Sequence, residues 1–245
     1  MVCVGYDVKK VLLNLIFPPK CIFCGKRLSP KTSKHVCSDC ANELPYCKAY
    51  HRCRRCGKPV AVSDTNMCKD CYKRRHYNTR ITSAFVYADG AKRAVVGFKK
   101  EKNAGFASTL AIYVAQMVKS DFGGVDFDVV VSVPPRKKGF SDEHFDQAAC
   151  LASAVSRRLG LNYISNALVQ KEVIKKQSSL SFDARIENVK GNFAVRKPEK
   201  IDKKTVLLID DVCTTGATLE ECAKVLKESG AFRVYAATIA TVPSI

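Results

Sequence analysis

The sequence contains no low-complexity tract and no apolar run close to the roughly 18 to 20 residues of a membrane-spanning helix. The second absence predicts that no segment spans a membrane, and 47% apolar residues exclude a disordered chain. The stretch Val8–Phe17 is interrupted by Lys9, Lys10 and Asn14 and is followed by prolines instead of a small-residue cleavage site. We therefore expect residues 1–20 to form an amphipathic helix, not a signal peptide, and the protein to be cytoplasmic.

Acidic residues are scarce, with 23 Asp and Glu against 41 Lys and Arg, so the chain carries a formal charge of +18. Most of the excess lies in residues 1–80, which hold 17 basic and 5 acidic residues. Such an excess permits a polyanionic partner such as nucleic acid, but it does not identify one.

The length of 245 residues suits one medium domain and a smaller one. From Ile81 onward, apolar runs typical of buried strands alternate with apolar stripes at helical spacing. The expected strands are Ile81–Ala88, Phe127–Val133, Thr205–Ile209 and Val234–Ala240. The expected helices run from Ala148 to Leu159 and from Leu219 to Leu226. This alternation predicts an α/β domain over residues 81–245, with a parallel sheet flanked by helices.

Thirteen cysteines occur in a chain without an export signal, and a reducing compartment argues against a disulfide scaffold. Eight of them form four C-x-x-C pairs, arranged as two sets in which 12 and 11 residues separate the pairs. Two pairs complete a closed tetrahedral site of four thiolates, which indicates a structural role without chemistry. The predicted zinc ligands are Cys21, Cys24, Cys37 and Cys40 in one set and Cys53, Cys56, Cys68 and Cys71 in the other. We predict one or two Zn²⁺ within residues 21–78, paired in sequence order, with a crossed arrangement left open.

The other cysteines and the histidines show no metal spacing. Cys150 and Cys222 fall in helical stripes, which predicts that they pack as small apolar side chains. Ordinary surface positions are expected for His35, His51, His76 and His144.

The segment from Val206 to Leu219 is the most informative part of the sequence. An apolar strand delivers Asp210 and Asp211 to the carboxyl edge of the sheet, and a short loop leads into a helix. The loop residues are Thr214, Thr215, Gly216, Ala217 and Thr218. Backbone N–H groups, threonine hydroxyls and the helix N-terminus suit a phosphate, while the two carboxylates suit a sugar diol or Mg²⁺. The pattern predicts a ribose 5-phosphate site; the alternative is that Asp210 caps the helix and the threonines form a turn.

This segment resembles the phosphoribosyl pyrophosphate (PRPP) motif of type I phosphoribosyltransferases. Together with the cysteine clusters, the chain from about Lys20 to Ala240 resembles the ComF family of DNA-uptake proteins. Gln177 to Phe193 is similar to that family's segment Q-x-x-L-S-x-x-x-R-x-x-N-x-x-G-x-F, which the resemblance makes a lid near the site. The resemblance implies a type I phosphoribosyltransferase-like sheet behind a zinc-ribbon module, with the acidic pair fixing the ribose of PRPP bound with Mg²⁺.

The same resemblance implies that a pyrophosphate loop follows the second strand, formed by Val133, Pro134, Pro135 and Arg136. Lys99 matches the lysine that leads the family's flexible loop, although the lysines around it are equally typical of a solvated surface run. One departure is Glu143-His144-Phe145-Asp146-Gln147, where the family usually reads R-G-F-N-Q. Added carboxylates near the expected pyrophosphate disfavour efficient transfer.

Two functions fit these features. The first is transfer of a phosphoribosyl group from PRPP to an acceptor that the sequence does not identify. The second is a non-enzymatic module in DNA uptake, regulated by PRPP, whose basic zinc region contacts single-stranded DNA or a helicase. The positive charge would come from Arg52, Arg54, Arg55, Lys73, Arg74 and Arg75. A solvated basic face is the alternative for these residues, and a zinc scaffold for assembly is a third possibility.

Overall fold

The computed structural model describes residues 18–32, 34–61, 66–72, 76–101, 104–135, 146–171 and 187–243. Several sequence predictions concern residues outside these ranges: nearly all of the helix over 1–20, Lys73 to Arg75, Arg136, Glu143 to Phe145, and residues 177–186 of the predicted lid. Within the described residues, no helix combines the length and the apolar character needed to cross a membrane.

The secondary structure alternates as predicted from Ile81 onward. The helices are α2 (Ser38–Glu43), α3 (Lys69–Tyr72), α4 (Asp89–Glu101), α5 (Ala104–Phe122), α6 (Gln147–Leu159) and α8 (Ala217–Glu228), with 3-10 turns η1 (Cys47–Ala49) and η3 (Pro198–Lys200). The strands are β1 (Ile81–Val86), β2 (Val129–Ser132), β3 (Asn162–Tyr163), β4 (Leu168–Gln170), β5 (Phe193–Val195), β6 (Thr205–Cys213) and β7 (Arg233–Thr241).

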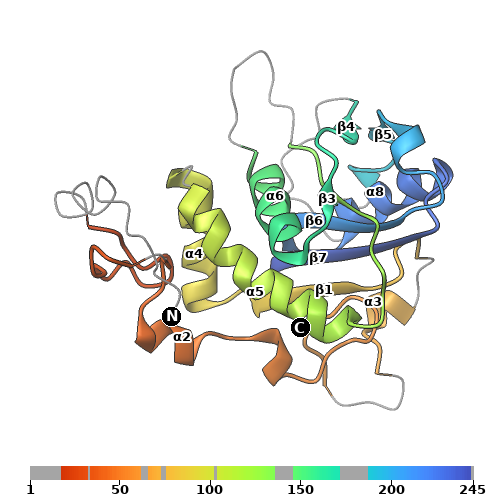
Figure 1. Cartoon of the computed structure of the whole chain (residues 1–245). Coiled ribbons are helices and arrows are strands. Elements are labelled where there is room, and N and C mark those ends of the chain that lie inside the picture. Colours follow the sequence, from red (N-terminus) through yellow and green to blue (C-terminus); the bar gives the residue numbers. More distant parts are fainter. Residues whose placement is uncertain are drawn as a thin grey trace.

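Five parallel strands form the central sheet, in the order β1-β7-β6-β2-β3. The register places Leu208 of β6 beside Ala236 of β7, which in turn lies beside Ile81 of β1. A purely parallel sheet has to be covered on both faces, and Figure 1 shows α5 and α6 on one face and α8 on the other. The predicted α/β fold is therefore confirmed. β4 and β5 form a separate antiparallel pair.

β6 is the middle strand of the sheet, and its side chains alternate between the two faces. Leu207 and Ile209 are buried with residues of α4, α5 and α6, whereas Val206 and Leu208 are buried with residues of α8. Burial of each such side chain contributes about 1.5–3 kcal/mol. Because both faces are covered, residues 206–209 of the strand form an uninterrupted apolar run.

β6 runs to Cys213, beyond the predicted end at Ile209. Pairing with β7 continues through Val212 and Cys213, and the Val242 N–H donates to the Cys213 carbonyl at 3.0 Å. A strand predicted from its apolar residues ends at the first carboxylate. Backbone pairing does not depend on side-chain polarity, so it continues past carboxylates at the edge of a sheet. The pair Asp210–Asp211 therefore belongs to the end of the strand and not to the loop.

The two cysteine clusters lie on opposite sides of the edge strand β1. Phe23 packs edge-on against Phe85 of β1, with ring centroids 5.5 Å apart, and belongs to the same buried cluster as α4 and α5. The second cysteine cluster is instead buried with Ile81 of β1 and with α8. Between them, the Val86 N–H donates to the Pro45 carbonyl at 2.8 Å. The connecting segment therefore covers the open edge of the sheet.

An ion pair anchors the second cysteine cluster to the sheet domain. The Arg52 guanidinium donates to both carboxylate oxygens of Asp121, at 2.6 and 2.9 Å, and Thr82 Oγ1 donates to the same carboxylate at 2.6 Å. The Asp121 side chain, at the end of α5, is 8% exposed. Burial raises the pKa of this carboxyl, but the hydrogen bonds from Arg52 and Thr82 outweigh burial and hold the pKa below its ordinary value.

We predict that Asp121→Ala lowers the free energy of unfolding by about 3 kcal/mol, because it leaves a largely buried guanidinium without its counter-ion. Because the folded-state pKa of Asp121 is depressed, this contribution is present above about pH 4 and is lost as the pH falls below that value. Urea unfolding followed by circular dichroism measures both effects. The control Asp126→Ala removes an exposed carboxylate and should change stability by less than about 0.5 kcal/mol. Equal destabilisation by the two variants would contradict the anchoring role.

Candidate functional site

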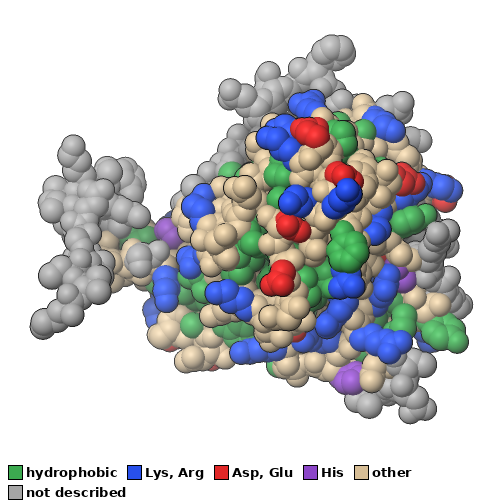
Figure 2. All heavy atoms as spheres, turned by 45° about the vertical axis from the view of Figure 1, so that its right-hand side comes forward, with side chains coloured by type: hydrophobic (Ala, Val, Ile, Leu, Met, Phe, Trp, Pro, Cys, Tyr) green, Lys and Arg blue, Asp and Glu red, His purple; other side chains and the backbone are tan. Residues whose placement is uncertain are grey.

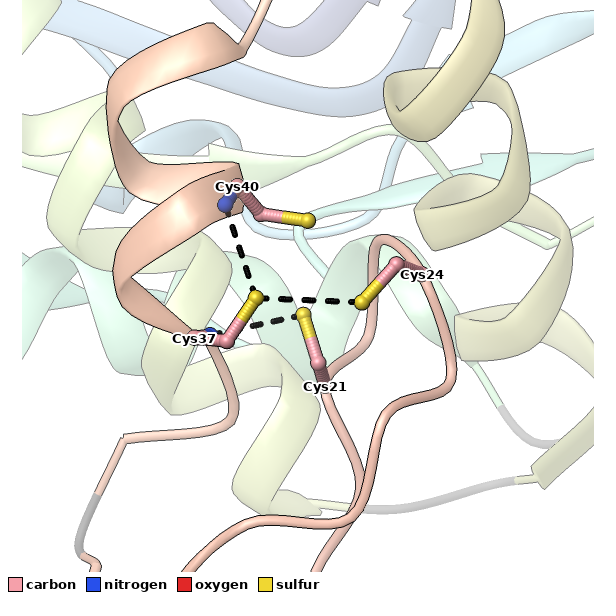
Figure 3. A group of neighbouring side chains, drawn as sticks. All are labelled: Cys21, Cys24, Cys37 and Cys40. Atoms are coloured by element: carbon pink, nitrogen blue, oxygen red, sulfur yellow. Dashed lines mark hydrogen bonds between the residues drawn. The ribbon is translucent and has the colours of Figure 1, made fainter.

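Four cysteine sulfurs converge in the first cysteine cluster, here termed the first ribbon, as Figure 3 shows. They belong to Cys21, Cys24, Cys37 and Cys40. All four Sγ atoms lie within 4.8 Å of one another, and those of Cys24 and Cys37 are 3.7 Å apart. A tetrahedron with Zn–S bonds of about 2.3 Å has an edge of roughly 3.8 Å, so this spacing fits a zinc ion. Burial opposes ionisation of Cys21, but backbone N–H groups that donate to its sulfur, Cys37 N–H first among them, lower its pKa to about 7.

The second ribbon repeats this arrangement with all four ligands buried. Its sulfurs belong to Cys53, Cys56, Cys68 and Cys71, and they also lie within 4.8 Å of one another. The two turns match: Gly25 and Gly57 both take the left-handed conformation, at φ 81° and 69°. In each turn the glycine N–H donates to the carbonyl of the first cysteine, at 2.8 and 2.9 Å. The ligands are therefore grouped in sequence order, and each group suits one Zn²⁺.

The predicted phosphate loop lies at the carboxyl edge of the sheet. β6 ends at Cys213, a three-residue bend follows, and α8 begins at Ala217. Gly216 is the N-cap of α8, with a φ of 78° in the left-handed region that favours glycine. The Thr215 hydroxyl accepts from the Ala217 N–H at 3.3 Å. Because Gly216 is the cap and Asp210 lies in β6, the alternative in which Asp210 caps this helix does not hold.

The loop lies at the point where two neighbouring strands of the sheet connect to strands on opposite sides of them. β2 leads through α6 to β3 and β6 leads through α8 to β7, so these neighbouring strands continue to opposite sides. Such a switch point opens a crevice at the carboxyl ends of the strands, where open α/β sheets bind ligands. The Val133 N–H donates to the Ile209 carbonyl at 2.9 Å, which places Val133–Pro135 directly beside the acidic pair.

Lys99 approaches the acidic pair from α4. Its Nζ lies 2.5 Å from Asp211 Oδ2, and the lysine side chain is about half exposed. The Asp211 N–H donates to Asp210 Oδ1 at 2.8 Å, which fixes the first carboxylate against the backbone of the second residue. The structure thus brings Lys99, Asp210 and Asp211 together, and this lysine is not simply part of a solvated surface run.

Asp146, in the segment that departs from the family pattern, is the N-cap of α6. Its Oδ1 accepts from the Ala149 N–H at 2.8 Å, and burial raises the pKa of the carboxyl. Asp and Asn are about equally good N-caps. The Asp in place of Asn therefore has a structural role at the start of α6.

Two adjacent acids of α8 hold this helix between its neighbours. Glu220 Oε1 lies 2.6 Å from His76 Nδ1, and His76 Nε2 lies 3.0 Å from the Cys71 carbonyl. Glu221 accepts from the Gly191 N–H at 2.7 Å. The His76 side chain is only 10% exposed, so the prediction of a surface histidine is wrong. Glu220 lies in the first turn of the helix, where a carboxylate complements the dipole, whereas no comparable sequence signal marks Glu221.

The basic residues of the second ribbon divide into two groups. Arg52 is paired with Asp121 and Arg55 donates to the Asn78 carbonyl at 2.6 Å, so both pack the ribbon against the sheet domain. Arg54, in contrast, is exposed. Figure 2 shows Lys and Arg side chains spread over one face of the molecule, with fewer Asp and Glu side chains among them.

Comparison with known domain families finds a match in each part of the chain. Residues 12–72 match the double zinc ribbon domain, and residues 146–244 match the phosphoribosyl transferase domain. In its domain order, the chain is thus similar to a double zinc ribbon followed by a phosphoribosyl transferase domain. β1 and β2 precede the second matched range and belong to the same five-stranded sheet as β6 and β7.

Known relatives match most of the chain. The DNA utilization protein YhgH of Salmonella typhimurium is 27% identical over 225 residues, which cover 90% of this chain and 96% of the relative. The competence protein ComFC of Bacillus subtilis is 26% identical over 231 residues, covering 86% and 89%. These matches confirm the resemblance to the ComF family. A solved glutamine PRPP amidotransferase from B. subtilis aligns with 56% of this chain and 26% of its own, at 20% identity and a TM-score of 0.38. That likeness is weak, and the fold assignment rests on the strand order and the domain match.

We predict that Cys53→Ser reduces the zinc content from two ions per chain to one and lowers the melting temperature. A site built from four cysteines needs all four thiolates, and structural zinc contributes folding free energy directly. Inductively coupled plasma mass spectrometry and thermal unfolding by circular dichroism measure the two effects. Cys150→Ser, which changes a cysteine outside both clusters, should retain two ions. Two ions in Cys53→Ser, or one in Cys150→Ser, would refute the ligand assignment.

Proposed function

We propose that this chain binds PRPP, as its Mg²⁺ complex, in the crevice between the carboxyl ends of β2 and β6. The observation that carries the proposal is the joint position of the Gly216 bend and the pair Asp210–Asp211 at the switch point of the sheet. Backbone N–H groups of Thr214–Thr218 suit the 5-phosphate, and carboxylate oxygens suit the ribose hydroxyls. Neither group alone specifies a ligand, but together they match the two ends of one sugar phosphate.

The remaining neighbours of the acidic pair suit the pyrophosphate. Val133–Pro135 lies on the β2 side of the crevice and Lys99 on the α4 side. Lys99 forms an ion pair with Asp211. When the ligand binds, the lysine exchanges this carboxylate for a phosphate oxygen, which its flexible stem allows. Asp211 then becomes available to the ribose.

Transfer of the phosphoribosyl group is the activity that this pose supports. The bond from C1 to pyrophosphate breaks, the acceptor forms the new bond to C1, and the neighbouring carboxylates stabilise the positive charge that develops between these events. The alternative is that PRPP is a regulatory ligand and no transfer occurs. In either case we assign the protein to DNA uptake, because its relatives are named competence and DNA utilization proteins.

We predict that the zinc-loaded protein binds PRPP in the presence of Mg²⁺ with a dissociation constant between about 1 μM and 1 mM. The double variant Asp210→Asn/Asp211→Asn should weaken binding at least about tenfold, because it removes charge-assisted hydrogen bonds to the ribose. Isothermal titration calorimetry measures both. Glu228→Gln, an exposed change at the far end of α8, is the matched control. No heat with the wild-type protein, or identical affinities for wild type and double variant, would reject the proposal.

Pyrophosphate release separates the two roles of PRPP. The wild-type protein is incubated with PRPP, Mg²⁺ and a panel of nucleobases or single-stranded DNA, with the double variant as the blank. Acceptor-dependent release assigns a transferase. Binding without release across the panel assigns a regulatory ligand instead.

We further propose that the basic N-terminal module contacts single-stranded DNA. The supporting observations are the ratio of 17 basic to 5 acidic residues in residues 1–80 and the exposed Arg54 beside the second zinc ligand set. Positive charge clustered around a rigid zinc site suits a phosphate backbone.

For this contact, we expect the logarithm of DNA affinity to fall linearly with the logarithm of salt concentration. Arg74→Ala/Arg75→Ala should reduce the slope by roughly 1.4, since each lost phosphate contact on single strands contributes about 0.7. Fluorescence anisotropy with a labelled oligonucleotide measures the slope. Lys200→Ala/Lys203→Ala removes two exposed charges from the other end of the chain and should leave the salt slope of DNA binding unchanged. An affinity that does not depend on salt would exclude a phosphate-contact mode.

A further inference from the structure

One side chain at the end of the second ribbon reaches the helix that follows the predicted phosphate loop. His76 lies five residues after the ligand Cys71, and its Nε2 atom is 3.0 Å from the Cys71 carbonyl oxygen. Its Nδ1 atom is 2.6 Å from Oε1 of Glu220 in α8. The side chains of His76 and Glu220 are only 10% and 18% exposed. The imidazole therefore bridges a zinc-ligand residue and the first turn of α8, in a place that excludes most water.

The other carboxylate oxygen of Glu220 is held by the chain that leaves the ribbon. Its Oε2 atom accepts from the Tyr77 N–H at 2.9 Å and from the Asn78 N–H at 3.4 Å. Three consecutive residues, 76–78, thus provide partners for both oxygens. Such a network holds a side chain in one position, so Glu220 ties α8 to the second ribbon.

Glu220 also belongs to the turn that begins at the cap of α8. Its N–H donates to the Gly216 carbonyl at 2.9 Å, which closes the first turn of the helix. Gly216 is the left-handed residue at which the loop becomes helical. The N–H groups of this bend and of the first helical residues are the ones that suit a 5-phosphate. Their orientation depends on where the first turn lies, and Glu220 fixes that turn.

Apolar packing supports the same link. Cys71, Ile81 and Ala217 belong to one buried cluster. A Cβ atom at Gly57 of the second ribbon would lie 2.7 Å from the Ile81 carbonyl oxygen, and a Cβ atom at Gly216 would lie 3.8 Å from Ile81 Cδ1. Ile81 therefore lies between the ribbon turn and the glycine that caps α8. Because protein interiors are close-packed, a displaced ribbon would also displace this support.

We propose that His76 is a positioning residue for the phosphate site: through Glu220 it holds the first turn of α8 in place and links ligand binding to the second zinc ion. This inference rests on the proposed function, since it concerns the same sugar phosphate. In this role His76 touches neither the ligand nor the metal. The four thiolates around the metal fix the Cys71 backbone, and the imidazole relates that position to Glu220. Such a link is reciprocal, so the phosphate should strengthen zinc binding at the second site by the same factor.

A double-mutant cycle tests the link in the full-length, zinc-loaded protein. Ribose 5-phosphate and PRPP, each with Mg²⁺, are titrated by calorimetry into wild type, His76→Ala, Glu220→Ala and the double variant. We expect each single variant to weaken both ligands by a similar factor of roughly five to ten, because the ligands share the 5-phosphate. The double variant should bind no more weakly than either single variant, because all three break one link. His51→Ala, which changes an exposed histidine of the same ribbon, should bind as wild type does.

Zinc affinity gives a second readout, which a merely structural role of His76 would not change. His76→Ala should retain two ions per chain, because it removes no ligand. In Cys24→Ser, which keeps only the second set of four cysteines, competition with a chelator of known affinity measures zinc binding at that site. Saturating ribose 5-phosphate should tighten this binding about fivefold, and the effect should vanish when His76→Ala is added. Cys53→Ser, which keeps only the first set, should show no effect of the ligand.

The outcomes separate this inference from the proposed function. If wild type binds neither ligand, the proposed function fails and the inference fails with it. If wild type binds and either single variant binds at least as tightly, the inference fails and the proposed function stands. Additive losses in the double variant would also overturn it, because the two side chains would then act separately. Should His76→Ala lose zinc, Glu220→Ala, which leaves the ribbon unchanged, has to show the loss of affinity by itself.

Discussion

The candidate site at the carboxyl edge of the sheet depends on one backbone conformation, the left-handed φ of 78° at Gly216. A residue with a Cβ atom adopts this conformation at a cost of roughly 1–2 kcal/mol, whereas glycine adopts it freely. The bend at Gly216 lets β6 turn into α8 within three residues, so that the positive end of the helix and the acidic pair lie at the same edge of the sheet. On the sheet side, Thr241 Oγ1 donates to the Cys213 carbonyl at 3.2 Å and fixes the start of the bend to β7.

Features encoded by short-range patterns could be predicted from the sequence. The strands β1, β2, β6 and β7, the helices α6 and α8 and the eight cysteine ligands each depend on residues a few positions apart, where periodicity and C-x-x-C spacing carry the information. The helices α4 and α5 and the short strands β3, β4 and β5 were not predicted. The end of β6 could not be predicted in the same way. Its last residues are held by backbone pairing with β7, and Asp210–Asp211 interrupts the apolar pattern without interrupting that pairing.

The contacts that position the site join residues far apart in the chain. Lys99 of α4 meets Asp211 of β6, while His76 meets Glu220 across 144 residues and Gly191 meets Glu221 across 30. No local pattern marks a lysine or histidine as half of such a pair, which is why a surface position was the natural expectation for His76. Only the fold shows that the first turn of α8 is held by a zinc ribbon on one side and by the turn before β5 on the other.

The two zinc ribbons are alike in sequence and geometry, but among the described residues they support different parts of the sheet domain. A ribbon of this size has little apolar core, so the positions of its side chains are set by the four thiolates around the metal. The first ribbon packs against Phe85 and the α4–α5 face of the sheet domain and supports them. The second ribbon packs against Ile81, which lies beside Gly216, and its His76 contacts Glu220 of α8. Loss of the second metal therefore loosens the support of α8 and of the bend before it, whereas loss of the first loosens the opposite face of the sheet.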